Sequence, residues 1–190
     1  MPTCDHVALL VRSLERTLAH LAPLGLPTGP IEDFPGEGTR EVYLGADDQP
    51  GRLLLLQALG TDGPYARALA KRGPGLHHVA FTVADARAFV GAHPGWLLLP
   101  HSLDSHSGSR TLWLGRPGVG TLVEVHHGTM TYAGDPVVER LEVCVEPGGR
   151  ASLVTGLSGS TEIVAGAGRM RIAGQELDLR ELVDHRCPPS

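Results

Sequence analysis

Two histidines, His6 and His78, occupy matching places in two similar segments of the chain. Residues 6–11, HVALLV, and residues 78–83, HVAFTV, agree at four of six positions with an offset of 72. Imidazole is the commonest metal ligand in proteins and a frequent proton-transfer group, so a repeated histidine suggests a shared chemical task. The repeat selects His78 and not its neighbour His77, which we expect to support or pack beside the site.

A glutamine and a glutamate interrupt the apolar runs that close the two segments. Gln57 follows four leucines at 53–56, and Glu124 lies within the run LVEV at 122–125. Polar side chains in buried strands need partners. Two segments that each supply one imidazole and one amide or carboxylate oxygen would surround a single point. The pattern therefore predicts a metal site with the ligands His6, Gln57, His78 and Glu124.

The identity of the metal stays open at this level. Mixed imidazole and oxygen ligands without thiolate suit Co²⁺, Mn²⁺, Ni²⁺ or Zn²⁺ and argue against a closed structural zinc site. We therefore expect a divalent cation as the cofactor.

The segments around these residues repeat as well, which predicts how they are positioned. Residues 39–45, TREVYLG, resemble residues 109–115, SRTLWLG, at an offset of 70. Residues 13–24 have helical apolar spacing with Ser13 as N-cap, and residues 85–92 show a shorter helical pattern. Each segment thus reads as a strand, a helix and three strands.

We therefore predict an α+β fold of two duplicated modules that form a curved, mixed β-sheet. The modules cover about residues 4–60 and 75–128, joined by KRGPG at 71–75, and together they form a domain over residues 1–128. The last strands are expected at 52–58 and 121–126.

A further segment, residues 135–190, contains no Phe, Tyr or Trp. Alternating residues at 141–146 and 169–172 are typical of half-buried strands, so a β-rich C-terminal extension is predicted. A segment so poor in aromatic residues would be marginal alone, and we expect it to pack on the main domain or across a homodimer. Another interpretation is a decayed third module with Arg140 in place of the histidine, which would bind no metal.

Composition excludes some partners. The formal net charge of the 190 residues is −5, which gives no electrostatic basis for nucleic-acid binding. No run approaches the roughly 18 apolar residues that a membrane span needs. Cys4, Cys144 and Cys187 lack the spacing of a metal or redox motif and are interpreted as reduced thiols. We therefore expect a cytoplasmic protein with no nucleic-acid or membrane partner.

Four short motifs, DHVAL, LLLLQ, GLHHVAF and GTLVEV, carry a resemblance to a known family. They resemble the vicinal oxygen chelate superfamily, which includes glyoxalases, bleomycin resistance proteins and dioxygenases, and within it the methylmalonyl-CoA epimerases. The resemblance covers about residues 4–128, and its most specific part is YARALAKRGPGLHHVAFTV. It implies paired βαβββ modules around a divalent metal held by His6, Gln57, His78 and Glu124.

The resemblance also implies an activity. Such enzymes epimerise a 2-substituted malonyl-CoA thioester by removing and returning the proton beside the thioester carbonyl, through a metal-stabilised enolate. Glu41 stands at the place of the family's catalytic glutamate, and Glu124 would be the second carboxylate. Glu41 breaks the internal repeat, because its counterpart is Thr111. An acyl-CoA thioester is the expected substrate.

Other functions remain as alternatives. A glyoxalase I-like lyase could use the same ligands. An extradiol dioxygenase needs two histidines, one carboxylate and more open positions on Fe(II), and Gln57 as a fourth ligand speaks against it. A non-enzymatic binding or resistance protein would not need four ligands. His126 and His127 are expected at the surface.

Overall fold

The computed structural model describes residues 2–102, 111–146 and 151–183, and its larger part repeats one order of elements. The first run consists of β1 (Thr3–Val11), α1 (Leu14–Leu21), β2 (Glu32–Phe34), β3 (Thr39–Leu44) and β4 (Arg52–Ala58). The second run consists of β5 (Gly75–Val83), α3 (Ala86–Ala92), β6 (Leu97–Leu98), β7 (Thr111–Gly115) and β8 (Leu122–His127). The connections contain η1 (Ala22–Leu24), α2 (Pro64–Arg72) and η2 (Pro100–Ser102).

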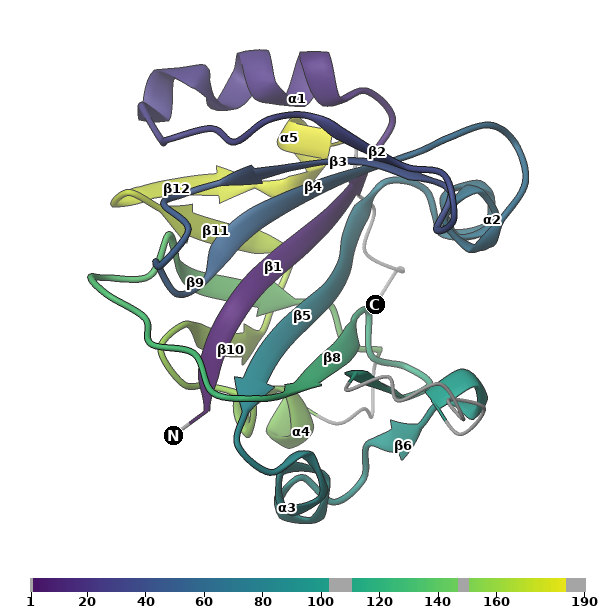
Figure 1. The fold of residues 1–190 in the computed structure, drawn as a ribbon, viewed down its shortest axis with the longest axis vertical. Helices are drawn as coiled ribbons and strands as arrows, with labels where there is room; N and C mark the ends of the chain where they lie inside the picture. The colour runs from purple at the N-terminus through teal and green to yellow at the C-terminus, as the bar shows by residue number, and fades with distance from the viewer. Residues whose placement is uncertain (1, 103–110, 147–150, 184–190) are drawn as a thin grey trace.

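These strands form one eight-stranded mixed sheet with the order β2-β3-β4-β1-β5-β8-β7-β6. The first strands of the two runs, β1 and β5, are antiparallel neighbours at its centre, and each pairs in parallel with the last strand of its own run. The strands of the two repeated histidines therefore lie side by side (Figure 1). The predicted α+β fold with two βαβββ units is confirmed, whereas the division at residue 128 stays a prediction.

The local sequence explains the helices that flank the sheet. The hydroxyl of Ser13 accepts a hydrogen bond from the backbone N–H of Arg16 and caps α1, as predicted. Asp85 caps α3 in the same way through the backbone N–H groups of Arg87 and Ala88. Within the described ranges, no helix has both the length and the apolar character that a membrane crossing requires.

A second, four-stranded sheet follows in the chain and lies behind β1 and β4 in Figure 1. Its order is β10-β9-β11-β12. The elements of this part are β9 (Val138–Val143), α4 (Ala151–Thr155), β10 (Glu162–Ala165), β11 (Arg169–Ile172), β12 (Gln175–Asp178) and α5 (Leu179–Val183). The buried side chains of Leu141 and Met170 join the same apolar core as Val7 and Val123 of the large sheet. The extension thus packs on the main sheet within one chain.

The extension is not a third copy of the module. Its elements again run strand, helix and three strands, but β9 lies between β10 and β11. In both modules the first strand pairs instead with the last strand of its own run. Arg140 forms an ion pair with Glu162 at 3.1 Å. The decayed-module interpretation is therefore not supported by the strand pairing.

The cysteines differ in state. Cys4 is free and fully buried, and burial raises the pKa of its thiol to about 12. Cys144 takes part in a disulfide, so the prediction of a reduced thiol is wrong there. Cys187 lies outside the described residues. Location in the cytoplasm, which was argued partly from reduced thiols, stays a prediction.

Truncating Met170 should destabilise the whole protein, because its side chain lies in the core that both sheets share. For Met170→Ala we expect a loss of about 2–5 kcal/mol in the free energy of unfolding, measured by urea denaturation. Gln175→Ala, an exposed change on the next strand, should stay within about 0.5 kcal/mol of the parent protein. Equal stability of the two variants would contradict a shared core.

Candidate metal centre

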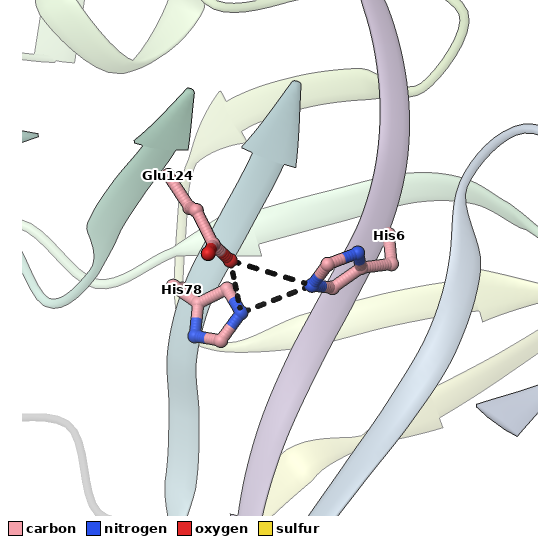
Figure 2. Close-up of side chains that lie close together, drawn as sticks. All are labelled: His6, His78 and Glu124. Atoms are coloured by element: carbon pink, nitrogen blue, oxygen red, sulfur yellow. Dashed lines mark hydrogen bonds and ion pairs between the residues drawn. The ribbon is translucent and has the colours of Figure 1, made fainter. Parts of the chain in front are cut away.

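Three of the predicted ligands meet on one face of the large sheet. His6 comes from β1, His78 from β5 and Glu124 from β8, which are adjacent strands (Figure 2). His6 Nε2 lies 3.0 Å from His78 Nε2, and Glu124 Oε2 lies 3.7 Å from the first and 3.1 Å from the second. All three side chains are 13% exposed or less. One small point is thus surrounded by two imidazole nitrogens and a carboxylate oxygen.

The protonation states of this cluster suit a cation. Burial lowers the pKa of His78, which favours the neutral imidazole that metals bind. Burial alone would raise the pKa of Glu124, but hydrogen bonds from His126 and His78 outweigh it and hold the carboxyl well below its usual range. A carboxylate and two close imidazole nitrogens, with little solvent access, form a set that a divalent ion would satisfy.

The carboxylate of Asp5 contacts the ring nitrogen of His6 that does not face His78. The pairing of β1 with β5 shifts between Cys4 and His6, so Asp5 is the extra residue of a bulge and lies beside His6. Its Oδ2 lies 2.5 Å from His6 Nδ1, and its Oδ1 accepts a hydrogen bond from the Tyr132 hydroxyl at 2.8 Å. Metal-bound histidines generally donate their second N–H to such a carboxylate. This contact therefore supports a metal site independently of the distances within the triad of His6, His78 and Glu124.

A matching irregularity places His77 beside His78. The register shifts again opposite Ala8 and Leu9, which leaves His77 as the extra residue on β5. The Nδ1 atoms of the two neighbouring histidines lie 2.8 Å apart. Burial, followed by the effect of His78, lowers the pKa of His77 to about 3, so its ring is neutral. The expectation that His77 supports the site without being a ligand agrees with this contact.

Gln57 does not belong to the cluster, contrary to the sequence-based expectation. In the parallel pairing of β1 and β4, His6 faces Arg52, whereas Gln57 faces Val11. Five residues along a strand separate Gln57 from that level by roughly 16 Å. Its Oε1 instead accepts a hydrogen bond from the backbone N–H of Leu14 at 2.8 Å, at the start of α1. Among the described residues, the cluster therefore contains three of the four predicted ligands.

Strand alternation explains this correction. On β4 the side chains that line the cavity around the triad are Arg52, Leu54 and Leu56. Gln57 is the next residue and points to the other face, because successive side chains of a strand alternate. A leucine therefore occupies the part of the cavity wall where a fourth ligand from this strand would stand.

Glu41 lies in the same cavity, which has a volume of about 380 Å³. Its carboxylate accepts a hydrogen bond from the Thr39 hydroxyl at 2.6 Å. Burial raises the pKa of Glu41, and this effect outweighs the hydrogen bond from Thr39. Glu41 therefore lies near His6, His78 and Glu124 but is not one of the three candidate metal ligands. Glu41 thus lines the same cavity as the three clustered residues, and its catalytic role stays a prediction.

His126, which was expected at the surface, has a side chain that is 35% exposed and also contacts the candidate site. Its Nε2 lies 3.5 Å from Glu124 Oε1, and its Nδ1 lies 3.1 Å from the Thr111 hydroxyl. The hydrogen bond to Glu124 raises the pKa of His126. The signal was present in the sequence, because residues 124 and 126 of a strand share one face. His127 is exposed, as expected.

The comparison with known families agrees with this architecture. Residues 5–100 match the Glyoxalase/Bleomycin resistance protein/Dioxygenase superfamily. The chain therefore belongs to this superfamily. A comparison with curated proteins found no significant match.

Solved structures include several similar folds. A hypothetical protein from Bacillus halodurans C-125 has a TM-score of 0.55 and 22% identity, over 70% of this chain and 99% of that one. A methylmalonyl-CoA epimerase in complex with methylmalonyl-CoA and NH4+ has a TM-score of 0.51 and 26% identity, over 69% and 99%. A Streptomyces coelicolor methylmalonyl-CoA epimerase variant with 2-nitronate-propionyl-CoA has a TM-score of 0.51 and 25% identity, over 68% and 97%.

The assignment of three ligands predicts different outcomes for two substitutions. His78→Ala should abolish stoichiometric binding of Zn²⁺ or Co²⁺, measured by calorimetry, because it removes one of three ligands. Gln57→Ala should leave the metal affinity unchanged and lower the free energy of unfolding by about 1 kcal/mol, since it removes a partner of the first helical turn. Loss of metal in Gln57→Ala would restore the four-ligand prediction.

Asp5 should tune the metal without binding it. Asp5→Asn removes the charge behind His6 and should weaken metal affinity by roughly 10–100-fold while stoichiometry stays at one ion. Asp33→Asn, a change of the same type at an exposed ion pair with Arg40, serves as the control and should have no effect. Unchanged affinity in Asp5→Asn would show that the contact does not support the ligand.

Proposed function

We propose that this protein is a metal-dependent epimerase of a 2-substituted malonyl-CoA thioester. The observation that carries the proposal is the shared cavity of the triad His6, His78 and Glu124 with the separate, partly buried carboxyl of Glu41. Similarity to a methylmalonyl-CoA epimerase at 26% identity supports the choice of substrate. The reaction exchanges the proton beside the thioester carbonyl from one face of the carbon to the other.

His6, His78 and Glu124 would hold the cation, for which Co²⁺, Mn²⁺, Ni²⁺ and Zn²⁺ are candidates. When bound, such an ion supplies Lewis-acid stabilisation of the negative charge that develops on the thioester oxygen. The buried Asp5 keeps the His6 ring in one orientation and the neutral His77 does the same for His78. These contacts fix the ligand atoms before the substrate arrives.

Glu41 is the proposed base. Its raised pKa makes its carboxylate a stronger proton acceptor than an ordinary surface glutamate, and the Thr39 hydroxyl orients one of its oxygens. Glu124 is the proposed second carboxyl. Its Oε2 faces the two imidazoles, and its Oε1 lies 3.5 Å from His126.

Assembly and location complete the proposal. Exposed apolar side chains lie beside or in both edge strands of the large sheet, with Ile31 and Phe34 at β2 and Leu97 and Leu98 in β6. Edge strands of this kind favour pairing with another chain, and we include a homodimer in the proposal. A cytoplasmic enzyme is consistent with acyl-CoA thioesters as substrates.

The position of Gln57 favours a second candidate, an extradiol-type dioxygenase. Two histidines and one carboxylate with open positions are the typical ligand set of non-haem Fe(II) oxygenases. The argument from sequence against this class was the fourth ligand, and Gln57 is instead bonded to Leu14. Oxygen consumption by Fe(II)-loaded protein with a catechol, without hydrogen exchange on thioesters, would replace the epimerase by this activity.

Hydrogen exchange tests the proposed reaction directly. Metal-loaded protein with methylmalonyl-CoA in D₂O should introduce deuterium at C2 and interconvert the two epimers, as followed by NMR and chiral analysis. Absence of exchange with every malonyl thioester tried would refute the proposal. Isomerisation of a glutathione hemithioacetal in its place would identify a glyoxalase-type lyase.

Glu41→Gln should separate proton transfer from metal binding. Turnover should fall by roughly 10²–10⁴-fold, as is typical for a lost general base, while metal stoichiometry and fold are retained. Glu32→Gln is the matched control, since Glu32 pairs with Glu41 across the edge strands but is exposed. The control should keep full turnover. Loss of metal together with activity in Glu41→Gln would assign Glu41 a structural role.

A further inference from the structure

Arg52 brings a positive charge to the wall of the metal cavity. It is the residue of β4 that faces His6 in the parallel pairing, and its side chain is 13% exposed. The guanidinium carbon lies 4.3 Å from the centre of the Tyr43 ring, and the His6 ring meets the same tyrosine edge-on at 5.5 Å. Arg52 is thus held beside the triad by a cation–π contact.

One donor of this guanidinium has no protein partner. Arg52 Nε is buried and makes no hydrogen bond within the described part of the chain. The closest ion-pair contact joins Nη1 to Asp47 Oδ1 at 3.5 Å, which is longer than an ordinary hydrogen bond, and the Asp47 side chain is fully exposed. Buried donors without partners are rare in folded proteins, so the position calls for an acceptor from outside the chain.

The nearby carboxylate of Asp5 does not fill this role. Among the described residues, no hydrogen bond or ion pair joins it to Arg52, and its two oxygens instead contact His6 and the Tyr132 hydroxyl. A guanidinium presents parallel N–H groups that match the two oxygens of a carboxylate. Farther along the same strand, Leu54 and Leu56 make the wall of the cavity apolar. The cavity therefore offers a cation at one end of this strand and an apolar wall at the other.

We propose that Arg52 binds a carboxylate of the substrate and that the site selects carboxylate-bearing molecules on this basis. The inference rests on the proposed function only in taking this cavity for the substrate site. For a malonyl thioester it assigns the free carboxylate to Arg52, so that the thioester oxygen alone turns towards His6, His78 and Glu124. The apolar wall then receives the 2-substituent. Arg52 is a specificity residue and takes no proton.

Binding of malonate, a small dicarboxylate, tests the inference without turnover. Zinc-loaded parent protein should bind malonate in a calorimetric titration, and Arg52→Gln should weaken that binding by roughly 10–100-fold because a charge-assisted contact is lost. Arg52→Lys keeps the charge without the planar fork and should fall between the two. The zinc content of each variant, measured before and after titration, should equal that of the parent.

Arg40→Gln is the matched control, because Arg40 lies on the neighbouring strand and forms a hydrogen-bonded ion pair with Asp33. It should bind malonate like the parent protein. Circular dichroism and thermal melting confirm that each variant folds. If Arg52→Gln is unstable, the comparison of Arg52→Lys with the parent decides, since equal affinities would overturn the inference.

The outcomes separate this inference from the proposed reaction. Malonate binding that depends on Arg52, without hydrogen exchange on any malonyl thioester, supports the carboxylate site and refutes the epimerase. Hydrogen exchange on methylmalonyl-CoA with the same KM in the parent and Arg52→Gln supports the epimerase and overturns the carboxylate site. Failure of the zinc-loaded parent to bind malonate also overturns it.

Discussion

The antiparallel pairing of β1 with β5 is the constraint on which the site depends. It places the first strands of both modules at the centre of the sheet, so that His6 and His78 approach to 3.0 Å although 72 residues separate them. The same pairing contains two bulges, which turn Asp5 and His77 towards the imidazoles they support. Two of the three ligands and the residues that support them thus arise from one strand pair, and β8 adds the carboxylate of Glu124 together with His126 beside it.

The cavity around the triad has a charged part and an apolar part, and this difference can orient a bound molecule. Arg52 contributes a partly buried cation beside His6, whereas Leu54 and Leu56 contribute an apolar wall on the same strand. Glu41 adds a carboxyl whose pKa is raised by burial. A molecule that carries both a carboxylate and an apolar branch has a single favourable orientation in such a space, and orientation is a large part of catalytic rate enhancement.

The sequence was sufficient for the fold and for three ligands because both rest on an internal repeat. His6 and His78 recur at an offset of 72, and Glu124 was found as a polar residue that interrupts the apolar run at 122–125. The prediction that Gln57 is a ligand was wrong because the four leucines before it show no alternation of polar and apolar residues. The sequence therefore did not indicate which face of the strand Gln57 would take. The bulges at Asp5 and His77 depend on the register between two distant strands, which no local pattern contains.

The extension on the far side of the large sheet has a consequence for how such chains diverge. Its strands enclose the residues of β1, β5 and β8 that face away from the cavity, so these positions are confined by dense packing. The residues of these strands that line the cavity, His6, His78 and Glu124 among them, lie outside that core. Substitutions can therefore accumulate on one side of each strand and redirect chemistry while the scaffold persists.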